Sequence, residues 1–409
     1  MIDFDRHTRI LRQSPTDQVF VQNPYPIYAA VRSVSPIFFW EDYGHWCCAG
    51  FDDVSALLRD RRFGREVTHV ASREELGWEP IPDRLQPFYD IEAHSLLERE
   101  PPVHMRLRGL VNRAFVSRQV ERLRPRIEAL ANDLIDGFEA KGEAELITAY
   151  ATPIPVVVIC ELLGVPAREA DRLLDWSHRM VAMYQFGRTR ADEDAAVQAS
   201  QAFAAFIRAY VDERRSAPGD DLISRLIAAE EAGETLSTDE LVTTCILLLN
   251  AGHEATVHAI GNAVSAILLH DVDVAGTTAR PGGFGALAEE LLRFDPPLHM
   301  FTRYALEDLD YKGVSFRKGD KVGLLLGAAN RDPGRFPDPD RIDPARSDAG
   351  HVAFGAGIHF CVGAPLARLE LQVALEVLFR RLPRLRLRER PRYRDAYHFH
   401  GAERIDVAW

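Results

Sequence analysis

One long helical pattern, over residues 237–269, constrains this chain more than any other feature. It opens on Ser-Thr-Asp-Glu, in which Ser237 and Glu240 have the spacing of a capping box. Apolar residues then recur at three- and four-residue intervals over roughly 33 residues, which corresponds to a helix of about 50 Å. So long a helix has to cross the whole core of a globular protein. The sequence therefore predicts one dominant central helix.

The middle of this pattern breaks local rules. Residues 250–256 read Asn-Ala-Gly-His-Glu-Ala-Thr. Gly252 costs about 1 kcal/mol of helix propensity, and a carboxylate such as Glu254 is expensive in a core unless it is paired. A sequence that breaks such rules in mid-core usually accommodates something there. We expect a ligand or a reaction site beside this stretch.

The rest of the chain predicts a mainly α protein with small β-sheets. Helical periodicity covers 118–135 and 191–214, and short strand-like runs fall in 36–48, 309–326 and 385–409. Alternating strand and helix units, which a doubly wound fold needs, are absent. The length of 409 residues suggests two or three domains at about 150 residues each. Because the sequence contains no linker, low-complexity tract or repeat, we predict a single domain over 1–409.

The composition excludes several classes of function. Lys and Arg number 49 against 61 Asp and Glu, for a net charge of −12, which disfavours binding to nucleic acids or anionic membranes. Five cysteines are too few for a disulfide scaffold. No apolar run approaches the roughly 20 residues of a membrane helix, and the first residues lack a signal-peptide pattern. We expect a cytoplasmic protein without membrane segments.

One cysteine differs from the others in its neighbours. Residues 351–363 read His-Val-Ala-Phe-Gly-Ala-Gly-Ile-His-Phe-Cys-Val-Gly, and an amphipathic helix follows from Ala364 to about Arg380. Cys361 therefore precedes a helix N-terminus, where backbone N–H groups and the dipole stabilise a thiolate. The glycines let the chain turn tightly and let a flat partner approach. Such a thiolate suits a metal with a soft ligand, or a nucleophile.

Considered alone, Cys361 leaves other interpretations open. It is also compatible with a buried structural cysteine at a glycine-rich turn. Zinc is disfavoured because no second cysteine lies at metal-ligand spacing. A cysteine hydrolase needs a base, and His359, two residues away, is poorly placed to be one.

Four motifs together resemble the cytochrome P450 family. The loop Phe-Gly-x-Gly-x-His-x-Cys-x-Gly over 354–363 resembles its haem-binding loop, and Glu-Leu-Leu-Arg at 290–293 resembles its Glu-x-x-Arg helix, expected over 286–294. Residues 330–340 resemble the segment before the haem loop, and Ala-Gly-x-Glu at 251–254 resembles the oxygen-binding groove. A weaker match covers 100–108. The resemblance implies the family's fold, a triangular helical prism around a buried haem.

The resemblance also implies the cofactor contacts. Cys361 corresponds to the axial thiolate ligand of the iron of haem b. The positions that bind the haem propionates correspond to His104, Arg108, Arg303 and His359. Further haem contacts are expected at Ala251, Gly252, Phe354, Gly355 and Gly363. The Glu290–Arg293 pair is expected to be structural and to join the pre-haem segment through Arg335 or Arg341.

The distal helix shows one departure from the family pattern. Glu254 matches the acid that relays protons to bound dioxygen. Ala255 stands where the family commonly has a threonine, and Thr256 follows one residue later, about 100° further round the helix. Thr256 therefore replaces that threonine only if the helix is distorted. Ordered water or a substrate hydroxyl delivering the protons, poor coupling, or the use of peroxide are the three consequences we consider.

The substrate pocket is expected to be apolar. By resemblance it draws on 65–95, 176–186, 247–255, 298–301 and 397–399, a set rich in Met and aromatic residues. Such a lining favours a hydrophobic organic molecule of moderate size. His94, His299 and His398 are candidates for recognising a polar group. The specific contacts that we predict are Phe88, Tyr89, Leu248, Leu298, Met300 and Phe399.

The activity implied is that of a haem monooxygenase which hydroxylates or epoxidises such a substrate. Dioxygen is the oxidant, and electrons come from NAD(P)H through a separate ferredoxin or flavodoxin and its reductase. We expect a monomer. An arginine-dense stretch could steer an acidic partner; it consists of Arg106, Arg108, Arg113, Arg118, Arg122 and Arg124. The alternatives are a peroxide-driven peroxygenase or decarboxylase, which Ala255 favours, and a haem-binding sensor or carrier without catalysis.

Overall fold

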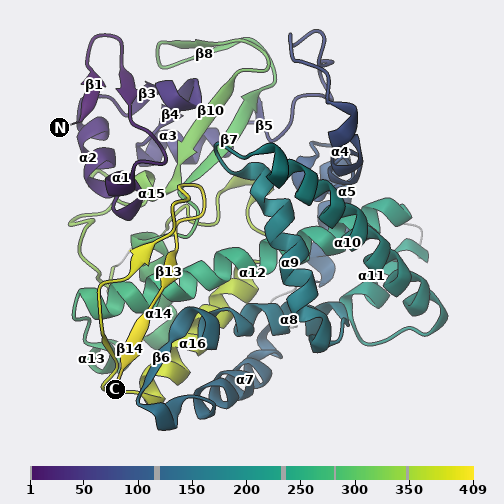
Figure 1. The fold of residues 1–409 in the computed structure, drawn as a ribbon. Coiled ribbons are helices and arrows are strands. Elements are labelled where there is room, and N and C mark those ends of the chain that lie inside the picture. Colours follow the sequence, from purple (N-terminus) through teal and green to yellow (C-terminus); the bar gives the residue numbers. More distant parts are fainter. Residues whose placement is uncertain (1, 115–119, 232–235, 281, 347–349) are drawn as a thin grey trace. The chain divides into compact units, whose positions relative to one another are not determined.

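The computed structural model describes residues 2–114, 120–231, 236–280, 282–346 and 350–409 (Figure 1). The chain forms two compact units, each built from separate stretches of sequence. The first unit comprises Met1–Gly64, Arg124–Ile154 and Ala255–Trp409. The second unit comprises Arg65–Leu123 and Pro155–Glu254. The single domain predicted over 1–409 stays a prediction.

The first unit contains a mixed sheet of seven strands, in the order β1-β2-β3-β4-β10-β7-β5. Its strands are β1 (Asp3–Asp5), β2 (Ile10–Arg12), β3 (Ile37–Trp40), β4 (His45–Cys48), β5 (Phe63–Gly64), β7 (Met300–Ala305) and β10 (Lys321–Leu325). Strands β10 and β7 pair antiparallel, whereas β10 and β4 pair parallel. The pairing places β7, the strand that carries Arg303, between β10 and the edge strand β5.

Three smaller sheets also belong to the first unit. Strands β6 (Glu143–Glu145), β11 (Arg386–Leu387) and β14 (Asp406–Ala408) form one, in the order β11-β14-β6. The other two are the pairs β8 (Leu309–Tyr311) with β9 (Val314–Phe316), and β12 (Arg392–Tyr393) with β13 (Ala402–Arg404). The strands confirm the predicted runs at 36–48, 309–326 and 385–409. Strands β1, β2, β5, β6 and β7 were not predicted.

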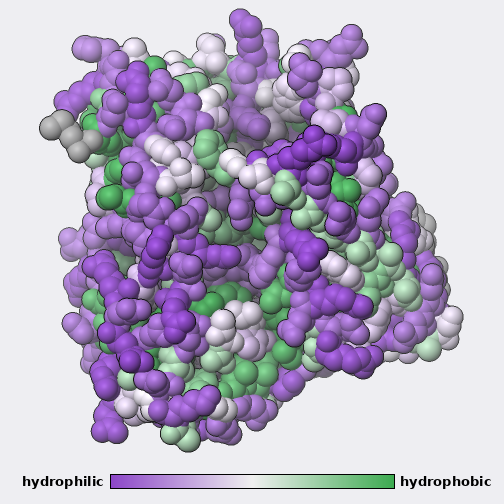
Figure 2. All heavy atoms as spheres, viewed as in Figure 1, coloured by the Kyte–Doolittle hydropathy of each residue, from purple (hydrophilic) through white to green (hydrophobic). Residues whose placement is uncertain are grey.

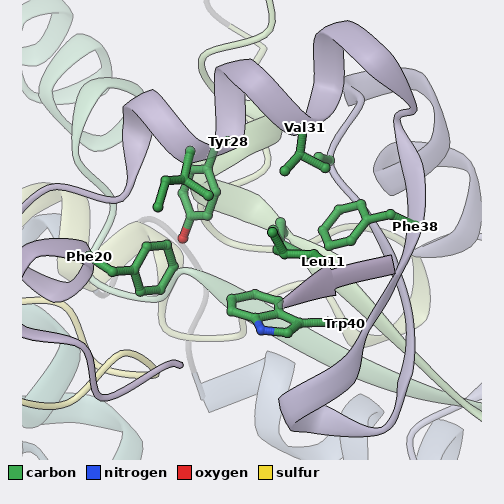
Figure 3. A pocket seen from close by; sticks show the side chains of 9 residues that line it. Leu11, Phe20, Tyr28, Val31, Phe38 and Trp40 are labelled. Carbon is green, nitrogen blue, oxygen red and sulfur yellow. The ribbon is translucent and has the colours of Figure 1, made fainter. Parts of the chain in front are cut away.

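One core of the first unit lies where helices meet the sheet. Aromatic and aliphatic side chains from β2, β3, α1 (Gln18–Gln22) and α2 (Tyr25–Val34) line a small pocket there (Figure 3). Phe20, Tyr28, Phe38 and Trp40 are each at most 3% exposed. Phe20 meets Tyr28 and Trp40 edge to face, so the side chains fill the space themselves. This pocket is packed core and leaves no room for a substrate.

The remaining helices of the first unit include those that carry the family motifs. They are α3 (Phe51–Leu57), α7 (Arg124–Asp136), α13 (Val274–Thr278), α14 (Gly283–Phe294), α15 (Leu326–Ala329) and α16 (Ala364–Arg381). Helix α16 packs against α7 and α14. Helix α14 contains the predicted 286–294 helix, and α16 contains the helix predicted from Ala364. Helix α7 begins later than the predicted residue 118, and Arg118 lies outside the described residues.

The second unit is helical. Its helices are α4 (Gln86–Glu92), α5 (Val103–Ala114), α9 (Ala170–Val181), α10 (Arg190–Ser216) and α11 (Leu222–Glu231), with nearly all of α8 (Pro153–Leu163). Helix α10 packs against α9, α4 and α11. It contains the predicted 191–214 helix and begins at a capping box of Thr189 and Asp192.

Helix α12 (Thr238–Leu269) is the long helix that the sequence predicts, and its 32 residues are α-helical throughout. Its capping box is formed as expected. The backbone N–H of Glu240 donates to Ser237 Oγ at 3.1 Å, and the N–H of Ser237 donates to Glu240 Oε2 at 2.9 Å. Residues up to Glu254 belong to the second unit and those from Ala255 to the first.

The surface agrees with the composition. Hydrophilic side chains cover most of the face seen in Figure 2, with apolar ones in small groups between them. Within the described ranges, no helix is long and apolar enough to span a membrane.

Candidate active site

The loop that carries Cys361 is fixed by its own backbone. The N–H of Cys361 donates to the carbonyl of Phe354 at 3.0 Å, and the N–H of Gly355 donates to Val352 at 2.9 Å. A short 3-10 turn, Gly357–His359, lies between them. Helix α16 starts three residues after Cys361, with Pro365 in its first turn. This confirms the predicted placement of the thiol before a helix N-terminus.

Two glycines of this loop have to be glycines. Gly355 and Gly357 have φ of +69° and +72°, in the left-handed region that other residues avoid. A Cβ on Gly357 would lie 2.4 Å from the carbonyl oxygen of Leu58, and one on Gly355 would lie 3.0 Å from Phe301 Cε2. The glycines therefore let the loop fold back closely on its surroundings.

Cys361 also differs from the other cysteines in its exposure. None of the five cysteines, all of which the structure describes, is in a disulfide; Cys47, Cys48, Cys160 and Cys245 are buried, whereas Cys361 is half-buried. Burial raises the pKa of Cys160 to about 11 and that of Cys245 to about 12, so both stay protonated thiols. A site for a thiolate ligand is thus confined to Cys361.

A charged cluster holds the start of the loop. Arg368 on α16 donates to both carboxylate oxygens of Glu289 at 2.6 and 3.0 Å, and His351 Nε2 lies 3.3 Å from the same carboxylate. Burial alone would raise the pKa of Glu289, but His351 and Arg368 outweigh it and lower that pKa to about 2. The guanidinium of Arg368 also lies 4.6 Å from the centre of the Phe354 ring. The cluster ties the loop to α14 and α16.

The Glu-x-x-Arg pair is buried and fully engaged. Arg293 donates to both oxygens of Glu290 at 2.8 Å. Its Nη1 also donates to the carbonyls of Asn330 at 2.9 Å and Pro339 at 2.8 Å. The pair therefore holds the segment that precedes the haem loop, as predicted.

The partner of this pair was wrongly predicted. Arg341 contributes its backbone carbonyl, at 3.1 Å from Arg293 Nη2, and its side chain reaches towards Asp343 instead. The guanidinium of Arg335 lies over the rings of Phe51 and Phe336. The side chain that reaches Glu290 Oε1 is Arg346, at 3.0 Å. No spacing rule in the sequence indicates a partner 56 residues away.

The predicted propionate-binding residues divide between the two units. In the first unit, Arg303 on β7 is 3% exposed and donates to the carbonyl of Thr302, and His359 is half-buried. In the second unit, His104 and Arg108 both lie in α5, four residues apart on one face. His104 is buried, and Arg108 is half-buried and donates to Asn112 Oδ1 at 3.0 Å.

Two small residues in the middle of α12 are more exposed to solvent than the buried residues close to them along the helix. Ala251 is exposed and Gly252 is half-buried, whereas Leu248, Leu249 and His253 are buried. A Cβ on Gly252 would meet the Ile159 side chain at 3.3 Å. Gly252 thus lets the Ile159 side chain approach the helix closely, and exposed helix surface at mid-length is left at Ala251.

Ala255 and Thr256 follow on the same helix, with no distortion between them. Because α12 is α-helical from end to end, Thr256 points about 100° away from position 255. Thr256 is buried. The condition under which Thr256 would replace the missing threonine is therefore not met.

The acid on this helix has a partner that the sequence did not reveal. His178 Nε2, from α9, lies 3.0 Å from Glu254 Oε2, and both residues belong to the second unit. The two are 76 positions apart, and a histidine between Ser177 and Arg179 on a helix carries no signal of such a contact.

The predicted substrate contacts have mixed outcomes. Leu298 and Phe399 form a β-bridge and so lie together, and the Phe88 and Tyr89 rings meet edge to face at 5.5 Å. Leu248 is buried on α12. Met300, 3% exposed, belongs to the core cluster around Trp40, because alternation along β7 turns it away from the face of Phe301. Met300 as a substrate contact is therefore unsupported.

The three histidines proposed to recognise a polar group differ in burial. His299 is fully buried, and Tyr28 Oη lies 2.9 Å from its Nδ1. His299 is therefore a core residue and is not placed to contact substrate. His94 and His398 are half-buried.

The residues present fit a haem. A haem is a flat apolar ring with two carboxylates, and its iron takes an axial ligand from the protein. In the first unit, a half-exposed thiol stands at a helix N-terminus, and the buried arginine Arg303 can meet a carboxylate. In the second unit, Ala251 and Gly252 leave helix surface uncovered.

Comparison with known proteins agrees with this chemistry. The family model described as Cytochrome P450 matches residues 82–274 and 285–389. The polyketide biosynthesis cytochrome P450 PksS of Bacillus subtilis (strain 168) is 35% identical over 404 residues, covering 96% of this chain and 98% of the relative. The 6-deoxyerythronolide B hydroxylase of Saccharopolyspora erythraea is 36% identical over 393 residues, covering 94% of this chain and 92% of the relative.

Solved structures show the same fold. The crystal structure of P450BioI in complex with hexadec-9Z-enoic acid ligated acyl carrier protein matches with a TM-score of 0.88 and 34% identity, covering 96% of this chain and 100% of that one. This confirms the predicted fold class, mainly α with small sheets. The chain belongs to the cytochrome P450 family, and it is an oxidoreductase of the monooxygenase class that uses haem with a cysteine thiolate ligand, dioxygen and electrons from partner proteins.

Proposed function

We propose that this protein inserts one atom of dioxygen into a hydrophobic small molecule, by hydroxylation or epoxidation, at a haem b held by Cys361. The observation that carries the proposal is Cys361 itself. It is the one cysteine of five that is not buried, and it stands directly before the N-terminus of α16. Backbone N–H groups at a helix N-terminus stabilise a thiolate over a thiol.

The residues around the haem have separate tasks in this proposal. The bound haem supplies the activation of dioxygen. In the first unit, Arg303 and His359 are the proposed partners of the propionates, and the resemblance implies the same role for His104 and Arg108. Phe354, Gly355 and Gly363 form the loop surface against the ring. In the second unit, the small side chain of Ala251 leaves exposed helix surface on α12, which is the proposed place for dioxygen and substrate.

Glu254 is the proton-handling residue in this proposal. Its carboxylate is 9% exposed and lies 3.0 Å from His178 Nε2, whose ring is 47% exposed. A proton can therefore pass from solvent through the imidazole to the carboxylate. The relay does not depend on a hydroxyl at position 255.

Peroxide-driven peroxygenation or decarboxylation is the second candidate. Ala255 and the undistorted course of α12 favour it, because no hydroxyl occupies the place of the family's threonine. The retention of Glu254 favours the dioxygen route, since a peroxide-driven enzyme needs less proton delivery.

Hydrophobic substrates are supported by the relatives as well as by the predicted lining. The similar proteins include one named for polyketide biosynthesis and one named a hydroxylase of 6-deoxyerythronolide B. A similar solved structure has a fatty acyl chain attached to acyl carrier protein. Free polyketide-like molecules, fatty acids and carrier-bound acyl chains are therefore the classes to test first, against Phe88, Tyr89, Leu248, Leu298 and Phe399.

Electron transfer and location complete the proposal. A separate ferredoxin or flavodoxin, reduced from NAD(P)H through its reductase, supplies two electrons for each turnover of a monomer. We also propose that the protein works in the cytoplasm, where thiols stay reduced; this suits five cysteines that form no disulfide in the described structure.

A spectroscopic experiment tests the assignment of Cys361. The reduced, carbon-monoxide-bound protein is expected to show the difference band of thiolate-ligated haem, and Cys361→Ser should abolish it. Cys160→Ser, a buried thiol on α8, is the matched control and should keep the band. A band that survives in Cys361→Ser overturns the assignment.

A second measurement tests the substrate class. A library of the three classes is screened for the shift of the haem Soret band that accompanies displacement of water from the iron. Turnover of the compounds that shift the band, with reductant or with peroxide, then distinguishes the two enzymatic candidates. Shifts without product under both conditions would favour a sensor or carrier.

A further inference from the structure

We propose that His178, His253 and Glu254 form a binding site for one zinc ion, next to the proton-handling carboxylate. His178 comes from α9, and the other two are adjacent on α12. All three belong to the second unit. Their ligand atoms lie within 4.8 Å of one another, one of two such groups among the described residues.

Two of the three spacings between ligand atoms suit tetrahedral zinc, and the third lies within 4.8 Å. Zinc binds imidazole nitrogen and carboxylate oxygen at about 2.0–2.2 Å, so two ligands of a tetrahedron lie about 3.3–3.5 Å apart. His178 Nε2 lies 3.0 Å from Glu254 Oε2, and His253 Nε2 lies 3.6 Å from the same oxygen. Shifts of a few tenths of an ångström bring both pairs to the zinc geometry.

His253 is held in the tautomer that a metal ligand requires. Its Nδ1 lies 2.7 Å from the carbonyl oxygen of Leu249. A carbonyl only accepts, so Nδ1 carries the hydrogen, and the lone pair is on Nε2. Nε2 is buried and makes no hydrogen bond within the described part of the chain. Metal-binding histidines commonly donate their second nitrogen to a backbone carbonyl in this way.

The site also has an entrance. His253 and Glu254 are 4% and 9% exposed, whereas the side chain of His178 is 47% exposed. An ion can therefore reach the cluster from the side of His178, and a water molecule can take the fourth position. Two imidazoles and one carboxylate with an open fourth position are a ligand set that zinc uses in proteins.

The other cluster of this kind is a poorer candidate. Asp295, His299 and His400 in the first unit are between 0% and 6% exposed. The Asp295 carboxylate already accepts hydrogen bonds from Tyr25 at 2.6 Å and Tyr393 at 3.0 Å. A metal would have to displace both without a route to the site, so this cluster is a satisfied polar network.

Zinc at the proposed site affects catalysis. A zinc ion on Glu254 takes the oxygen that would otherwise accept a proton from His178. This consequence rests on the proposed function, in which Glu254 handles protons. Zinc would then act as a reversible inhibitor of monooxygenation without displacing substrate or haem.

The test measures zinc binding directly, on the haem-loaded protein, by competition with a chromogenic chelator and by metal analysis after gel filtration. Wild type is expected to bind one zinc per chain. His178→Ala and His253→Ala should each weaken binding at least 10-fold, because each removes one of three ligands. His69→Ala is the matched control, since His69 pairs with Glu66 at 2.6 Å on the surface and belongs to neither of the candidate metal groups among the described residues.

The outcomes separate the metal site from the proposed function. If wild type and His178→Ala bind zinc with equal affinity, the proposed site is overturned. It is also overturned if His69→Ala loses as much zinc affinity as His178→Ala does. The binding measurement does not depend on turnover, so an inactive protein that binds zinc through His178 and His253 still supports the site. Zinc that binds there and leaves product formation unchanged supports the site and overturns the role of Glu254.

Discussion

The Glu290 carboxylate and the Arg293 guanidinium form a doubly hydrogen-bonded ion pair whose side chains are 2% and 0% exposed. Burying two charges is costly unless their other polar atoms also find partners. Here the carbonyls of Asn330, Pro339 and Arg341 accept from Arg293, and Arg346 donates to Glu290. The pair therefore acts as a connector between α14 and the segment before the haem loop.

Glu290→Gln is expected to lower the free energy of unfolding by about 3–5 kcal/mol, because it leaves two buried guanidinium groups without their carboxylate. Urea denaturation followed by circular dichroism measures the change. Asp175→Asn is the control: its i,i+4 pair with Arg179 on α9 is 2.8 Å long but half exposed, so its loss should cost less than about 0.5 kcal/mol. Similar losses in both variants would contradict the connector role.

The neighbouring carboxylate Glu289 predicts a pH dependence of stability. His351 and Arg368 lower its pKa to about 2 in the folded protein, against the burial that would raise it. An unfolded glutamate has a pKa of about 4.3, so the folded state gains up to roughly 3 kcal/mol above pH 5. This contribution is lost as the pH falls through the interval from 5 to 2.

Glu289→Gln should therefore be less stable than wild type at pH 7, and the difference should shrink steadily between pH 5 and pH 3. Urea midpoints measured across that range test this. Glu128→Gln is the control, because its pair with Arg380 at 3.1 Å is about half exposed and contributes little. A difference that stays constant with pH would show that Glu289 acts through packing rather than charge.

Local signals explain why much of the fold was predictable. The Ser237–Glu240 box and Pro365 act within one helical turn, and both helices begin where the sequence indicates. Glu290 and Arg293 are three residues apart on one helix, so their pairing was also local. The position of Cys361 before α16 follows from the same kind of signal.

Contacts between distant segments could not be predicted. Arg346 reaches Glu290 because the segment before the haem loop folds back on α14, and periodicity carries no information about such a return. The contact of His178 with Glu254 depends in the same way on how α9 packs. Met300 lies in a core cluster because the register of β7 decides which face each side chain takes, and that register is fixed by pairing with β10.

A threonine at position 255 is expected to change the coupling of NAD(P)H consumption to product formation. Ala255→Thr supplies the hydroxyl that the family commonly has there, on a helix that is undistorted at this point. We expect more product per NAD(P)H consumed and less peroxide released, by about twofold or more. Ala228→Thr, an exposed helix position on α11, is the matched control and should leave coupling unchanged. Unchanged coupling in Ala255→Thr would mean that water or a substrate hydroxyl already delivers the protons.

Docking of the redox partner predicts a dependence on salt. Arg113 is exposed in the last turn of α5, within the arginine-dense stretch, while Arg118 lies outside the described residues. If these charges steer an acidic ferredoxin, Arg113→Glu should raise the KM for ferredoxin about fivefold or more and leave kcat unchanged. It should also flatten the dependence of KM on ionic strength, because screening then has one attractive charge fewer to act on.

The control for this prediction reverses another exposed charge on the same unit. The Arg168 side chain, in the turn Ala167–Glu169, is 77% exposed, so Arg168→Glu changes the net charge by the same amount at a different place. Steady-state reduction by ferredoxin, measured from low to high salt, compares the two variants with wild type. An effect that depends on position should appear in Arg113→Glu alone. Equal effects in both variants would assign the salt dependence to total charge, and no effect in either would place the docking surface outside α5.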